Sequence, residues 1–82
     1  MSPLNLSIEV IGWTGAALIL LAYLLLSAGR LPAKSVAYQG ANLLGAIAFA
    51  VNSGWHGAVP SAALNVVWAG IALFALVRMA RA

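Results

Sequence analysis

The sequence predicts an all-α membrane protein that crosses the bilayer three times. Hydrophobic residues make up 65% of its 82 residues, charged residues only 6%, and the mean hydropathy is +1.05. Soluble domains carry about 25% charged side chains, so this composition excludes an ordinary soluble fold. A hydrocarbon core of about 30 Å needs about 20 residues per helix. The chain therefore has room for at most three spans, and residues 1–82 are expected to form a single domain.

The few charged residues delimit the apolar segments. Glu9 and Arg30 enclose one uncharged segment, and Lys34 and Arg78 enclose a second, longer one. As one helix the second segment would be about 65 Å long, twice the hydrocarbon thickness, so it must turn back. The Asn, Ser and Gly residues of 52–57 predict that turn. We therefore expect three transmembrane helices, antiparallel to their neighbours, at about residues 7–28, 36–55 and 60–79.

Local signals support these helix limits. Ser35 is a candidate N-cap for the second helix, and Pro60 is suited to the first turn of the third. The first helix has the apolar character of a signal peptide, but the residues before it contain no Lys or Arg, and Glu9 is acidic. We therefore expect the first helix to be a retained span.

The basic residues predict the orientation. With three spans, the first connection and the C-terminus lie on the same side, and that side holds every basic side chain of the chain: Arg30, Lys34, Arg78 and Arg81. The positive-inside rule then places the N-terminus outside and the C-terminus in the cytoplasm. We expect the protein in the cell (inner) membrane. So strong a bias argues against dual topology, and any homodimer is expected to be parallel.

Polar and aromatic side chains form stripes on the predicted helices. On the second helix they recur every three or four residues, at Tyr38, Asn42, Gly45, Phe49, Asn52 and His56. On the third helix Asn65 and Trp68 lie one turn apart. Amides in lipid are costly unless they face a partner or water, so they either join helices or line a path for a solute. The predicted solute contacts are Asn65, Trp68, Asn42, Asn52, Tyr38 and Phe49.

A pattern W-x-G-x-A-L occurs twice, at residues 13–18 and 68–73. These two segments lie on helices that are predicted to run in the same direction. Small residues let helix backbones approach closely in membranes. If the repetition is not chance, the pattern predicts close packing at both places.

The types of residue present argue against a catalytic or metal-binding site. One His, one acid and no Cys cannot build a metal cluster or a nucleophile with its base, so we expect no enzyme, no metal and no cofactor. Four separated basic residues do not make a nucleic-acid surface. Glu9 and His56 are predicted near the outer surface, where they form either a gate, together with Tyr23, or a solvated pair. No acid lies deep in a span, so passive movement of a solute is favoured over proton coupling.

Several segments resemble the three-helix unit of the SemiSWEET and PQ-loop transporter superfamily. They are Gly12-Trp13, Tyr23, the short basic connection, Tyr38 to Asn42, His56-Gly57-Ala58-Val59-Pro60 and Leu64-Asn65-Val66-Val67. Leu25-Leu26 stands where that family has its Pro-Gln hinge, and the second helix lacks the family's Trp. The chain is also similar, and more closely, to an uncharacterised family of small three-span bacterial membrane proteins.

The resemblance implies a SemiSWEET-like half-transporter bundle. Two copies would form a parallel homodimer that moves a small neutral, sugar-like solute by alternating access, with Asn65 facing the solute. The expected partners are therefore a second copy, the lipid bilayer and that solute. The alternative is a non-transporting assembly factor or accessory subunit whose polar stripe binds another membrane protein.

Overall fold

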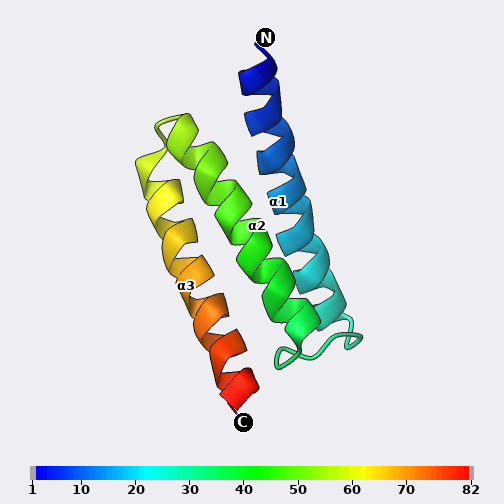
Figure 1. The fold of residues 1–82 in the computed structure, drawn as a ribbon. Coiled ribbons are helices and arrows are strands. Elements are labelled where there is room, and N and C mark those ends of the chain that lie inside the picture. The colour runs from blue at the N-terminus through cyan, green and yellow to red at the C-terminus, as the bar shows by residue number, and fades with distance from the viewer. Residues whose placement is uncertain (1, 82) are drawn as a thin grey trace.

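The computed structural model describes residues 2–81, which form three α-helices. They are α1 (Pro3–Ser27), α2 (Val36–Trp55) and α3 (Val59–Arg81). Figure 1 shows them as antiparallel neighbours with α2 in the middle. α2 packs against both of the others, whereas the backbones of α1 and α3 do not meet within the described residues. The prediction of an all-α protein with three helices is confirmed.

The helix ends follow local capping chemistry. The Ser35 side chain accepts a hydrogen bond from the backbone N–H of Tyr38 at 3.1 Å, which confirms the predicted cap of α2. Pro60 lies in the first turn of α3, as predicted. Beyond α1 and α2 the chain turns at Gly29 and Gly57, whose φ angles of 74° and 72° lie in the left-handed region that favours glycine.

The predicted start of the first helix near residue 7 is wrong, because α1 begins at Pro3. Ser2 is its N-cap, and the Ser2 hydroxyl accepts from the backbone N–H of Asn5 at 3.1 Å. Pro3 suits the first turn because its missing N–H has no partner to lose there. The Ser-Pro pair was therefore a start signal that the sequence already carried.

Two of the three helices are long and apolar enough to cross a membrane. These are α1 and α3, whose most apolar windows have mean hydropathies of 2.0 and 1.8. Only 17% and 6% of the residues in those windows are buried, whereas a core helix of a soluble protein would be mostly buried. α2 does not meet the same criterion, contrary to the prediction for all three helices. Its polar residues lower its hydropathy: Tyr38, Gln39, Asn42, Asn52 and Ser53.

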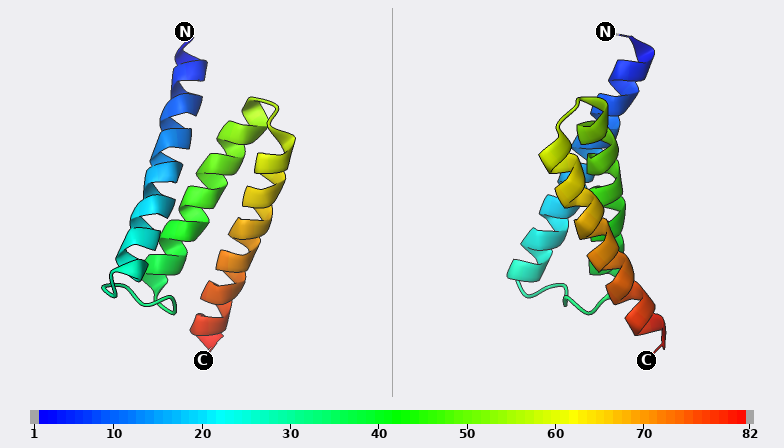
Figure 2. Two further views of the ribbon diagram at one scale, coloured as in Figure 1. Left: turned by 180° about the vertical axis from the view of Figure 1, so that it is seen from behind. Right: turned by 90° about the vertical axis from the view of Figure 1, so that its left-hand side faces the viewer.

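The interface between α1 and α2 is closed by glycines. A Cβ atom added to Gly15 would lie 2.7 Å from the Gly45 carbonyl oxygen, and one added to Gly45 would lie 2.8 Å from the Gly15 carbonyl oxygen. Neither position can therefore take a side chain without a backbone shift. Figure 2 shows α1 inclined to α2, so the two helices approach closely over a limited length. The glycine of the first W-x-G-x-A-L segment is thus closely packed, as predicted.

The second W-x-G-x-A-L segment behaves differently. Gly70 has open space where its Cβ would be, with no atom within 4 Å. Close packing through this glycine is therefore not seen. The glycine of the pattern thus meets a neighbouring helix on α1 and none on α3.

Candidate functional site

The candidate site is a cavity of about 180 Å³ between α2 and α3. Three of the predicted solute contacts line it, namely Tyr38, Asn42 and Trp68. Gln39, Ile71 and Ala72 complete the lining. The cavity thus combines aromatic surfaces with two amides, the side-chain types expected for a neutral polar ligand.

Asn42 is the centre of this cavity. It is only 5% exposed, and both polar atoms of its amide form hydrogen bonds. Its Nδ2 donates to the Tyr38 carbonyl oxygen at 2.9 Å, and its Oδ1 accepts from the indole Nε1 of Trp68 at 3.1 Å. Asn42 therefore fixes the edge of the Trp68 ring, while 45% of that residue stays exposed.

Asn65 does not line the cavity. Its Nδ2 donates to the Ser61 carbonyl oxygen one turn earlier at 2.9 Å, so the amide bonds to its own helix. The hydroxyl groups of Ser61 and Ser53 lie 2.9 Å apart and join α3 to α2 near this point. The residue that the family resemblance put first therefore does not line the cavity that Tyr38, Asn42 and Trp68 share.

The remaining predicted contacts lie toward α1. The Asn52 amide donates to the Ile8 carbonyl oxygen across the helix pair at 2.9 Å. The backbone nitrogen of Phe49 lies 3.1 Å from the Cβ position of Gly15. The single polar stripe predicted on α2 is thus shared between two neighbours, with Asn42 bonded to α3 and Asn52 to α1.

Two of the three predicted gate residues meet. The His56 Nε2 and Glu9 Oε1 atoms lie 2.8 Å apart, with side chains 51% and 36% exposed. Beside them the Trp55 indole donates to the Asn5 side chain at 3.2 Å. Tyr23 is exposed and lies near the other end of α1, so it does not join this pair. The geometry is that of a solvated pair tying α2 to the start of α1.

Sequence reasoning missed Gln39 as a lining residue. It follows Tyr38 directly and so lies off the stripe that was used to choose candidates. Its amide Nε2 donates to the Ala33 carbonyl oxygen at 3.0 Å, which ties the first connection to α2. The signal that would have found it is the presence of a Gln in a predicted membrane helix, whichever face of the helix it lies on. Within residues 2–81 no group of three or more His, Cys, Asp or Glu side chains gathers where a metal ion would bind.

Comparison with known proteins assigns the chain to a family but indicates no activity. One protein-family model matches residues 8–82. The chain belongs to that family. The family is an uncharacterised one, and membership does not make the chain a SemiSWEET. No curated protein and no solved structure matches the chain.

Proposed function

We propose that the protein is one subunit of a passive membrane transporter for small neutral polar solutes. The observation that carries the proposal is the α2–α3 cavity, in which Tyr38, Asn42 and Trp68 come together. Amides supply both donors and acceptors, and the exposed indole supplies a flat apolar surface. Such a lining suits a polyhydroxylated, sugar-like solute without requiring a charge on it.

The arrangement of the helices supports insertion of all three into the membrane. α1 and α3 have the length and hydropathy of spans, and α2 lies between them. A helix packed along two spans occupies the same depth in the bilayer, and its neighbours satisfy its polar side chains there. The molecule is 44 Å long, which matches a bilayer of about 40–45 Å with its headgroups. We place the N-terminus outside because every Lys and Arg lies at the other end.

One chain does not enclose the solute, so we propose a parallel homodimer. Ligand pockets usually measure about 300–1,000 Å³, more than the 180 Å³ of this cavity. A second subunit facing Tyr38, Asn42 and Trp68 would double the lining and shield these three residues from lipid. The charge bias requires both copies to insert in the same orientation. This arrangement is the one that the SemiSWEET resemblance implies, with Asn42 and Trp68 ranked ahead of Asn65 as contacts.

Uptake into liposomes tests the proposal. Purified protein is reconstituted and offered a panel of radiolabelled neutral solutes, sugars among them, and we expect equilibration of at least one. Asn42→Ala should abolish that flux. Asn65→Ala is the matched control, because each amide donates to the carbonyl oxygen four residues earlier at 2.9 Å and only Asn42 lines the cavity.

Two outcomes would count against this assignment. Flux lost with Asn65→Ala and kept with Asn42→Ala would move the solute path away from the cavity. No flux for any solute, with another membrane protein co-purifying in fixed ratio from native membrane, would favour an accessory subunit instead.

The dimer and its orientation have their own tests. Gly57→Cys should react with an impermeant reagent added outside intact cells, whereas Ala80→Cys should react only once the membrane has been made permeable. Two copies joined by a linker that contains one extra span should be active, whereas a linker without a span would invert the second copy and should abolish flux. Equal activity of both fusions would contradict a parallel dimer.

A further inference from the structure

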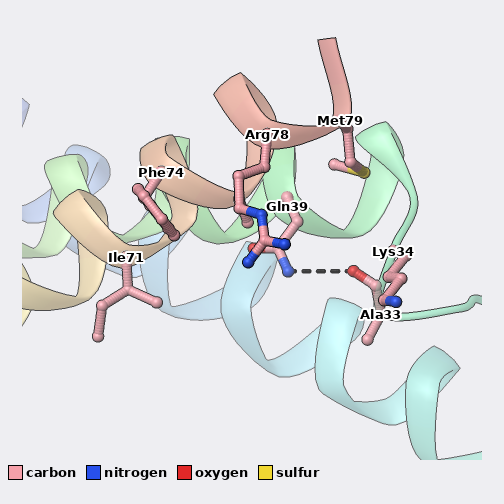
Figure 3. Close-up of a pocket in the computed structure, with 8 residues that line it drawn as sticks. Ala33, Lys34, Gln39, Ile71, Phe74, Arg78 and Met79 are labelled. Atoms are coloured by element: carbon pink, nitrogen blue, oxygen red, sulfur yellow. Dashed lines mark hydrogen bonds between the residues drawn. The ribbon is translucent and has the colours of Figure 1, made fainter. Parts of the chain in front are cut away.

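A larger cavity, of about 370 Å³, lies at the basic end of the molecule. It is formed by the first connection, the start of α2 and the end of α3. Its polar lining consists of two cations, Lys34 and Arg78, and the amide of Gln39. Figure 3 shows Arg78 reaching from α3 toward Gln39, with Lys34 on the connection beside them.

The two cations lack a carboxylate partner among the described residues. The chain has a single acidic side chain, Glu9, and it is paired with His56 at the opposite end of the bundle. Within residues 2–81 neither Lys34 nor Arg78 takes part in an ion pair. Two unneutralised cations at one cavity favour an anion there, and Arg and Lys are the side chains that proteins use for phosphate.

The cavity continues into an apolar face of α3. Ile71, Phe74 and Arg78 are spaced by three and four residues and so lie on one face of the helix. Ile71 and Phe74 are each 63% exposed. The Arg78 guanidinium carbon lies 6.0 Å from the centre of the Phe74 ring, so the charge sits where the apolar face ends.

We propose that this cavity binds an anionic phospholipid, with its phosphate between Lys34 and Arg78 and an acyl chain along Ile71 and Phe74. A soluble phosphate compound would use the cations but not the apolar face. Basic pockets between helices at the membrane surface are suited to anionic headgroups. The inference rests on membrane insertion of the bundle and not on transport, so loss of solute flux would leave it standing.

Native mass spectrometry of the purified protein in detergent tests the site. The probes are phosphatidylglycerol and phosphatidylcholine, added in equal amounts. The double variant Lys34→Gln/Arg78→Gln should lose preference for phosphatidylglycerol by about 30-fold, the effect expected for two cations at the membrane surface. Arg30→Gln/Arg81→Gln is the matched control, since it removes two exposed cations of the same end that do not line the cavity. The control should keep the preference.

Three further results decide the matter. An equal loss in both double variants would mean diffuse attraction and would overturn the proposal. Displacement of the lipid by inorganic phosphate or glycerol phosphate at equal concentration would assign the cavity to a soluble anion and likewise overturn it. Lys34→Arg/Arg78→Lys keeps both charges and should keep the preference, and its failure, with unchanged helicity by circular dichroism, would contradict charge as the cause.

Discussion

α2 meets α1 at a close backbone contact between two glycines, and no such contact is seen between α2 and α3 in the part of the chain that the structure describes. On the α1 side, Gly15 and Gly45 bring the two backbones together so closely that no Cβ fits between them. On α3, Gly70 is exposed and has open space at its Cβ position, whereas Ala46 of α2 and Ala72 of α3 are buried. Both cavities are lined by α2 and α3. Space for a ligand thus remains at the interface that glycines do not close.

The hydrogen bonds differ in one respect. Asn52 bonds to a backbone carbonyl oxygen of α1, and Trp55 and His56 pair with side chains of α1. Between α2 and α3 the pairs Asn42–Trp68 and Ser53–Ser61 both join side chain to side chain. Both cavities lie on the α2–α3 side, so under the proposed function a solute would enter between α2 and α3.

The largest expected effect is on the interface between α1 and α2. Gly15→Ala would place a Cβ 2.7 Å from the Gly45 carbonyl oxygen and 2.8 Å from the Ala48 Cβ atom. Overpacking of this kind costs about 1–3 kcal/mol, and we expect the upper part of that range because backbone must move. Titration of the purified protein from mild detergent into dodecyl sulfate, followed by circular dichroism, measures the loss.

Gly70→Ala is the control for that substitution. It lies in the same six-residue pattern but has no atom within 4 Å of the added Cβ. Stability should stay the same or rise slightly, since Ala favours helix over Gly. A similar loss in both variants would mean that the cost of Gly15→Ala does not come from its contact with α2.

The next largest effect is expected at the Asn42–Trp68 bond. Asn42→Ala removes the acceptor of the Trp68 indole and leaves that donor without its partner. Membrane hydrogen bonds between helices average about 0.6 kcal/mol and reach about 1.7, and burial of Asn42 favours about 1 kcal/mol. Trp68→Phe removes the same hydrogen bond from the donor side and part of the ring area. If Asn42→Ala cost as much stability as Gly15→Ala, the α2–α3 interface would be as rigid as the other.

The sequence predicts features that depend on neighbouring residues in the chain better than features that depend on packing between helices. Ser35 and Pro60 act on their own helix ends, and both were identified correctly because capping is local. Ser2 and Pro3 carried an equally local signal, which was overlooked. The inclination of α1 to α2 is set by packing between helices, so the sequence alone did not reveal that Asn42 and Asn52 serve different neighbours.

The candidate site shows the same limit. Periodicity placed Tyr38 and Asn42 on one face and Asn65 and Trp68 on another, which was enough to bring Asn42 and Trp68 together. It did not show that Asn65 would bond to its own helix, because an amide can reach either the carbonyl oxygen four residues earlier or a neighbouring helix. Gln39 was missed because only residues in phase with the stripe were considered.

A smaller effect is expected at the second side-chain pair of the α2–α3 interface. Ser53 is buried, and its hydroxyl lies 2.9 Å from that of Ser61. Ser53→Ala should cost about 0.6 kcal/mol in the dodecyl sulfate titration. Ser7→Ala is a control, because the Ser7 hydroxyl bonds within α1 and is exposed. A loss well above that of Asn42→Ala would place the main contact of this interface at Ser53 and not beside the cavity.

The smallest expected effect is at the Glu9–His56 pair. This pair links α1 to the end of α2 at the exposed end of their interface. Both side chains are a third or more exposed, so water and salt screen their attraction. A double-mutant cycle of Glu9→Gln and His56→Gln should give a coupling below about 0.5 kcal/mol that falls further in high salt. If the pair gates the solute path, the same variants would change the rate of flux while stability hardly moves. Unchanged flux together with this weak coupling would show that the pair is a solvated contact and not a gate.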